Sequence, residues 1–172
     1  KTGVAWLGTT VIYFFAAAFT GAKVVGVLGV RRVLVVGLTI LAVAGFLLTR
    51  IEPGAEYATD LLPALLLAGI AGGMCAPAVQ LGALSGVAPS MSGLASGLLE
   101  TFREIGGAIA VAVVATVLVS AVGKVGSAAQ AASEPLPTSA FQDAFWVITI
   151  VAVAGALTAA LAFPRRIPHV IE

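Results

Sequence analysis

The sequence predicts an all-helical integral membrane protein with five membrane-spanning helices. Of its 172 residues, 60% are apolar and only 10% are charged, whereas about 25% of the residues of a typical soluble domain are charged. The mean hydropathy is +1.11. The apolar residues form continuous runs, without the alternation of apolar and polar residues that is typical of a membrane β-barrel.

Charged residues and loop signals divide the chain into five apolar stretches. The expected spans are residues 3–21, 33–48, 61–87, 92–120 and 141–163. The second is short, but it reaches spanning length if Arg31, Arg32 and Arg50 extend their side chains to the two membrane surfaces. The fifth ends at Pro164 and the two arginines that follow it.

The distribution of lysine and arginine predicts the orientation in the membrane. The loop 22–32 contains Lys23 and two arginines, and the tail 164–172 contains two more, whereas the opposite loops have an excess of acidic residues. Positively charged loops generally stay in the cytoplasm. We therefore expect a multi-pass protein of the plasma (inner) membrane, with an external N-terminus, an external loop at 124–140 and a cytoplasmic tail at 164–172.

The fourth span carries charge inside an apolar helix. Glu100, Arg103 and Glu104 stand at i, i+3 and i+4 and so share one helical turn. The uncharged residues 105–123 alone cover roughly 28 Å, almost the whole hydrocarbon core. Because a charge at that depth costs about 2.5 kcal/mol or more, this turn must pair internally or face water or protein. Two interpretations stay open, namely a structural anchor or gate, and direct handling of substrate or protons.

Small residues recur at four-residue spacing, a pattern that allows membrane helices to approach closely. Pro77 removes one backbone hydrogen bond from the third span and is expected to kink it beside Gly72 and Gly73. These positions fit either helix packing or a hinge. The spaced sets are Gly69 with Gly73, Ala68 with Gly72 and Ala76, Gly93 with Gly97, and Gly106 with Ala110.

Several function classes are disfavoured by composition. Cys75 is the one cysteine and His169 the one histidine, so disulfides, metal sites and an enzyme built on clustered His or Asp are not expected, and no cofactor is implied. A net charge of +1 without a basic run argues against nucleic acid. The chain starts at Lys1 without a signal-peptide pattern, and we expect it to be the C-terminal part of a longer protein.

Three segments carry a resemblance to a known family. The segments GVRRVLVVG, LPALLLAGIAGGMCAPA and GLASGLLETFREIGGAIAVAVVATV resemble the C-terminal half of the major facilitator superfamily, and more narrowly its fourteen-helix drug:proton antiporter branch, the EmrB/QacA type. The likeness covers almost the whole chain. Its most specific positions are Gly93, Ala95, Ser96, Gly97, Thr101, Arg103, Gly106 and Gly107.

The resemblance implies that the five spans form most of a C-terminal six-helix half-bundle. Spans one, three and four would line the central path, and spans two and five would pack outside. Tyr13 and Trp6 also fit an interfacial aromatic belt. Gln80 fits a bond to a neighbouring helix, and Met74 fits plain packing. The candidates on the path-lining spans are Trp6, Thr9, Thr10, Tyr13, Met74, Gln80, Glu100 and Arg103.

Two departures from the family pattern matter. Many members have neutral amides where this chain has Glu100 and Glu104, so the pairing of Arg103 or the charge selectivity is expected to differ. The loop 22–32 looks like the second copy of the superfamily's cytoplasmic gating loop. Ala22 and Gly26 stand where that loop usually has Gly and Asp. This implies that the loop has lost its role as a charge clamp and has kept only its turn and its basic anchor. The positions that still match this loop are Gly29, Arg31 and Arg32.

The function implied by the resemblance is export of hydrophobic or cationic drugs by a proton-coupled secondary transporter working through alternating access. The expected partners are the lipid bilayer, the missing N-terminal half of the same protein, a small-molecule substrate and protons. The alternatives are a major facilitator carrier of a polar metabolite and a non-transporting polytopic membrane protein.

Overall fold

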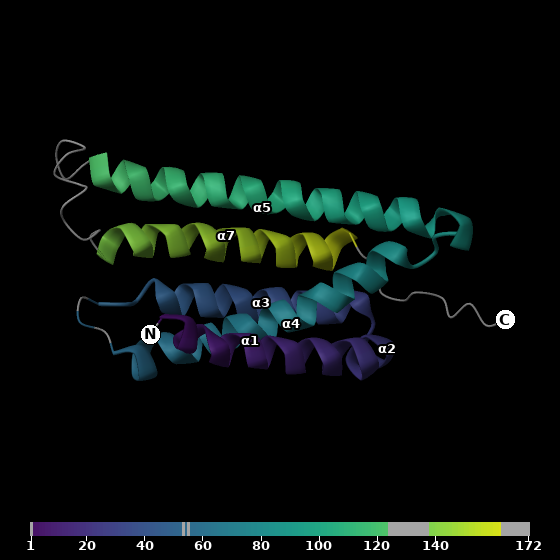
Figure 1. The fold of residues 1–172 in the computed structure, drawn as a ribbon, viewed down its shortest axis with the longest axis horizontal. Coiled ribbons are helices and arrows are strands. Elements are labelled where there is room, and N and C mark those ends of the chain that lie inside the picture. The colour runs from purple at the N-terminus through teal and green to yellow at the C-terminus, as the bar shows by residue number, and fades with distance from the viewer. Residues whose placement is uncertain (1, 53, 55, 124–137, 163–172) are drawn as a thin grey trace.

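The computed structural model describes residues 2–52, 54, 56–123 and 138–162, and over these residues every regular element is helical. The described helices run roughly side by side along the long axis of the molecule (Figure 1). The residues 124–137 of the expected external loop and the whole expected tail 164–172 lie outside the described residues. The long helices are α1 (Thr2–Phe19), α3 (Val30–Leu48), α4 (Leu62–Leu84), α5 (Ser92–Gly123) and α7 (Thr138–Ala162).

Within the described residues, four segments are long and apolar enough to cross a membrane. They are Val30–Leu48, Thr59–Leu84, Pro89–Ser120 and Thr138–Ala162. The first helix differs from the expected full span, because its apolar part within the described residues is the shorter segment Leu7–Phe19. The all-helical fold is thus confirmed over the described residues, which contain four candidate spans in place of the five that were expected.

The expected loop 22–32 is mostly helical. The chain continues from α1 through a π-helical turn, Thr20–Val24, into the short α2, Val25–Leu28. It breaks at Gly29, whose φ of +79° suits glycine. Arg31 and Arg32 therefore lie in the first turn of α3 and not in a loop. The apolar residues of α2 explain the difference, because packing Val25 into the core favours continuing the helix to the last residue before the glycine.

Tight helix packing depends on glycines. α3 packs against both α4 and α7, and α1 packs against α4. A Cβ on Gly73 would lie 2.5 Å from the backbone O of Tyr13 on α1, and one on Gly45 would lie 2.6 Å from Oγ1 of Thr149 on α7. Such contacts leave no room for a side chain, so these glycines set the distances between the helices.

The two ends of α7 are tied to neighbouring segments by polar side chains. The Gln142 amide donates to the backbone O of Ile51 at 2.7 Å, just beyond the end of α3. At the other end, Nη2 of Arg31 donates to the backbone O of Ala160. Beside this second tie lies a core cluster that includes the fully buried Val33 and Ala78. These ties fix α7 along the length of α3.

Candidate functional site

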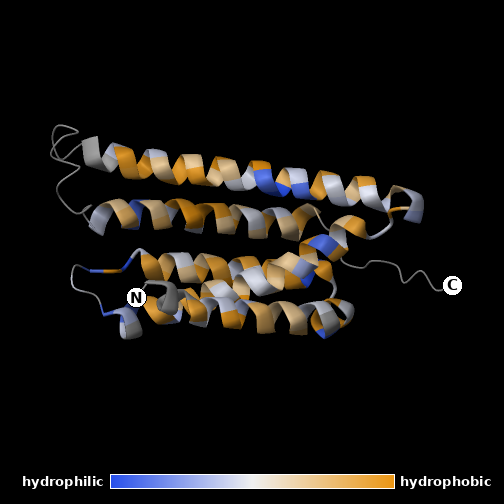
Figure 2. Ribbon diagram, in the orientation of Figure 1, coloured by the Kyte–Doolittle hydropathy of each residue, from blue (hydrophilic) through white to orange (hydrophobic). Residues whose placement is uncertain are grey.

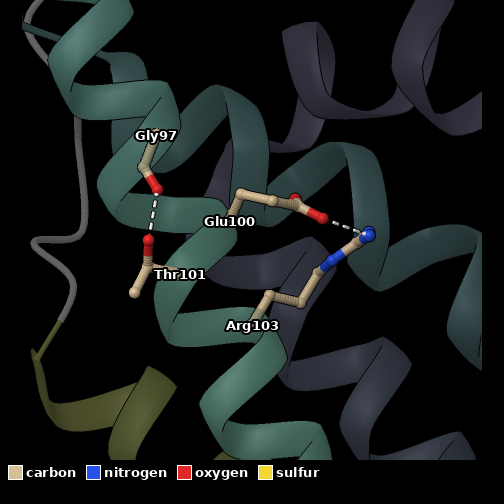
Figure 3. Close-up of polar contacts among 4 residues, drawn as sticks. All are labelled: Gly97, Glu100, Thr101 and Arg103. Atoms are coloured by element: carbon tan, nitrogen blue, oxygen red, sulfur yellow. Dashed lines mark hydrogen bonds and ion pairs between the residues drawn. The ribbon is translucent and has the colours of Figure 1, made fainter.

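The charged turn of α5 contains one ion pair and one carboxylate without a partner. Nη2 of Arg103 lies 2.6 Å from Oε1 of Glu100, and the two side chains are 65% and 53% exposed (Figure 3). Glu104 has no hydrogen bond or ion pair within the described part of the chain. The expected cluster of three charges is therefore reduced to a pair. The physical reason is that adjacent residues on a helix point about 100° apart, so Glu104 does not face Arg103.

The surface of α5 is largely unpacked. None of the apolar segment Pro89–Ser120 is buried. A Cβ on any of four glycines, Gly93, Gly97, Gly106 or Gly107, would meet nothing within 4 Å. Figure 2 shows the charged turn as a blue band within α5, with apolar residues on both sides of it. α5 contacts α7 along one side and α4 only weakly, so a long apolar helix with a charged turn and a mostly open surface is the main feature that the fold leaves unexplained.

Thr101 points to the other side of α5 from the ion pair. Its hydroxyl donates to the backbone O of Gly97 at 2.8 Å (Figure 3). This bond satisfies the hydroxyl within its own helix. Thr101 and Arg103, which both belong to the family resemblance, therefore lie on different faces of the helix.

The remaining path candidates do not meet at one place. The ring of Tyr13 lies against Gly72 on α4, 3.2 Å from the position of a Cβ there. Met74 packs against the core cluster that includes Val33 of α3 and Ala78 of α4. Gln80 is exposed on α4 beyond Pro77. The side chain of Trp6 lies outside what the structure describes.

Pro77 lies within α4, which continues as a helix through it. A Cβ on Gly21 would be 3.5 Å from Cβ of Pro77, so the π-helical turn of α1 contacts α4 beside the proline. Both features interrupt regular helical hydrogen bonding, and π-turns often mark functional positions. Sequence reasoning identified Pro77 but missed Thr20–Val24, because nothing in the residue types distinguishes a π-turn from an α-turn.

Sequence reasoning also missed a hollow at the connection between α3 and α4. It has a volume of about 490 Å³ and includes Arg50, Glu52 and Asp60 in its lining. The Arg50 guanidinium lies 4.9 Å above the centre of the Phe46 ring, and Oδ2 of Asp60 accepts a hydrogen bond from the backbone N of Glu56. From the sequence alone, Arg50 was assigned only to the end of the second span, and the acidic residues of this connection were used only to predict orientation.

Cys75 faces a neighbouring helix. Its Sγ lies 2.7 Å from the position of a Cβ on Gly37 of α3, and the residue packs against the core cluster. In the full-length protein, a maleimide should therefore modify Cys75 at least about tenfold more slowly than a cysteine placed at the exposed Ser85 in a Cys75→Ala background. Modification at equal rates, slowed by substrate, would instead place Cys75 in a water-filled path.

Comparison with known proteins identifies three relatives. The chain is 42% identical over 90 residues to the puromycin resistance protein of Streptomyces alboniger, covering 50% of this chain and 18% of that protein. It is 33% identical over 127 residues to the cephamycin export protein CmcT of Amycolatopsis lactamdurans, covering 74% and 24%. It is 29% identical over 103 residues to the uncharacterized MFS-type transporter YvkA of Bacillus subtilis, covering 60% and 23%.

The chain spans less than a quarter of the length of these relatives. No family model and no solved structure matches it. Over part of its length the chain is therefore homologous to transporters of the major facilitator superfamily associated with antibiotic export and resistance, and these homologues are not enzymes. Together with the apolar helices, this similarity indicates a multi-pass membrane protein.

Proposed function

We propose that this chain is the C-terminal part of a proton-coupled secondary transporter that exports hydrophobic or cationic drugs by alternating access. The observation that carries the proposal is the similarity to an antibiotic export protein over 74% of the chain. The fourteen-helix antiporter branch is part of the proposal, because the residues from Gly93 to Gly107 resemble that branch most closely.

The open surface of α5 supports this assignment. An apolar helix with four uncovered glycines suits close packing against further helices, and the segments that match this chain make up only 18% and 24% of two homologous proteins. We propose that helices of the remaining part of the protein lie against α5, so that its charged turn faces the central path and not lipid.

The two acids of that turn have different proposed roles. Glu100 is already paired with Arg103, which suits an anchor or a gate that opens when the pair separates. Glu104 is exposed and has no partner in the described residues, so its carboxylate is available to a proton or a cationic drug. In a water-filled path, such a charge avoids the cost of contact with hydrocarbon.

Transport by the complete protein tests the function. The full-length protein, reconstituted in liposomes, should move a fluorescent hydrophobic cation or puromycin against its gradient when a pH gradient is imposed. Transport should stop when an ionophore collapses that gradient, and protein-free liposomes supply the control. Movement of polar metabolites without movement of any drug would favour the metabolite carrier, and movement of neither would contradict a transport function.

A further inference from the structure

A second hollow lies where α3 begins and α7 ends. Its volume is about 440 Å³, and its lining consists of Leu28, Arg31, Arg32, Val35, Val36 and Ala160. The hollow therefore combines two arginines at the end of the helices with an apolar wall that continues along α3. None of the six lining residues is acidic.

The electrostatic potential in the hollow is positive for two independent reasons. Both arginines belong to the first turn of α3, and the helix N-terminus itself has a partial positive charge. Gly29 precedes this turn and supplies no side-chain cap, so backbone N–H groups of the first turn have no side-chain acceptor. A bound anion would satisfy both the helix end and the guanidinium groups.

Arg31 has hydrogen-bonding capacity left over. One of its Nη atoms donates to the backbone O of Ala160, but its buried Nε has no acceptor within the described residues. Neither arginine belongs to an ion pair in the described part of the chain, where Arg103 pairs with Glu100. A buried donor without an acceptor is costly, and an oxyanion in the hollow would offer one after a small rotation of the guanidinium.

The apolar wall decides which kind of anion fits. Leu28 and Val36 are 44% and 47% exposed, and Val35 and Val36 lie one turn deeper along α3 than the arginines. A free anion would leave this wall uncovered, whereas a lipid would cover it with an acyl chain. Arginines placed between helices at a membrane surface suit phosphate-bearing headgroups.

We propose that this hollow binds an anionic phospholipid, with the phosphodiester at Arg31 and Arg32 and an acyl chain along Val35 and Val36. The bound lipid would link the start of α3 to the end of α7. The site is independent of the drug path, so it stands even if the proposed export function fails.

Native mass spectrometry of the full-length protein in neutral detergent tests the site. We expect the protein to retain phosphatidylglycerol in preference to phosphatidylcholine with the same acyl chains. Arg32→Gln should weaken that retention about fivefold, the usual effect of one basic residue near an anionic membrane. Lys23→Gln is the matched control, because Lys23 is exposed on the preceding π-helical turn but does not line the hollow. This variant should retain phosphatidylglycerol as well as the wild type does.

Arg31 requires a folding control because its side chain also holds the end of α7. Arg31→Lys keeps the charge and should retain the lipid better than Arg31→Gln, at matched melting temperatures. Three results would overturn the proposal: equal retention of the two lipids, equal retention by the Arg32→Gln and Lys23→Gln variants, or displacement of the lipid by millimolar inorganic phosphate. The last result would identify the ligand as a free anion.

Discussion

Gly73→Ala is expected to destabilise the packing of α1 on α4 by about 3 kcal/mol, the upper part of the usual range for overpacking. The new methyl group would lie 2.5 Å from the backbone O of Tyr13, 2.7 Å from Cβ of Ala16 and 2.9 Å from the backbone N of Ala17. Two of these atoms are backbone, so no side-chain rotation relieves the clash. The helix α1 must move as a whole.

The neighbouring glycine provides a matched control. In Gly72→Ala the methyl group would meet only the ring of Tyr13, at 3.2 Å, and a ring can shift by a few tenths of an ångström. Both substitutions replace glycine by alanine in α4, so the gain in helix propensity is the same. The melting temperature of the full-length protein in detergent should fall for Gly73→Ala and stay nearly unchanged for Gly72→Ala. Equal melting temperatures would contradict the close approach seen here.

This packing also shows how far the sequence alone could predict the fold. Hydropathy is a property of single residues, so it identified helical membrane segments, and the four-residue spacing indicated where helices could approach. Neither could predict which helix meets which. The contact of Gly73 with α1 and that of Gly37 with Cys75 depend on how the helices are rotated about their axes, which tertiary packing determines.

The start of α3 illustrates a second limit. Charges and glycine suggested a loop over residues 22–32, but the structure breaks the helix only at Gly29. Membrane-end arginines are compatible with a loop or a first helical turn, because their long side chains reach the surface from either. The sequence therefore predicted that the arginines lie at a membrane surface, but not that they lie beside Ala160 of α7. The proposed lipid site depends on that contact.

The sequence predicted that the three charged residues share one helical turn, but not which of them form an ion pair. The spacing of Glu100, Arg103 and Glu104 correctly indicated one helical turn, yet only the i, i+3 pair forms. Side-chain direction separates Glu104 from Arg103. The near-complete exposure of α5 could not be predicted either, because an apolar helix has the same sequence pattern whether it faces lipid or other helices.

The largest functional effect is expected from replacing both acids of the charged turn with glutamine in the full-length protein. Glu100→Gln with Glu104→Gln should leave expression and melting nearly unchanged, because exposed ion pairs contribute only about 0–1 kcal/mol to stability. Drug-driven proton exchange should be lost, and affinity for a cationic drug should fall roughly tenfold, the equivalent of about 1.4 kcal/mol. The single variant Glu104→Gln should reproduce most of this loss, since its carboxylate is the unpaired one.

Arg103→Ala separates the functional interpretation from the structural one. If the turn faces a water-filled path, removal of Arg103 leaves two solvated acids, and the free energy of unfolding should fall by no more than about 1 kcal/mol. If helices of the complete protein bury the turn, the same change leaves unpaired charge in a dry interface and should cost about 3–5 kcal/mol. We expect the smaller cost together with altered transport. A well-folded double glutamine variant with unchanged transport and pH dependence would rule out the proposed roles of the acids and leave the ion pair as an anchor.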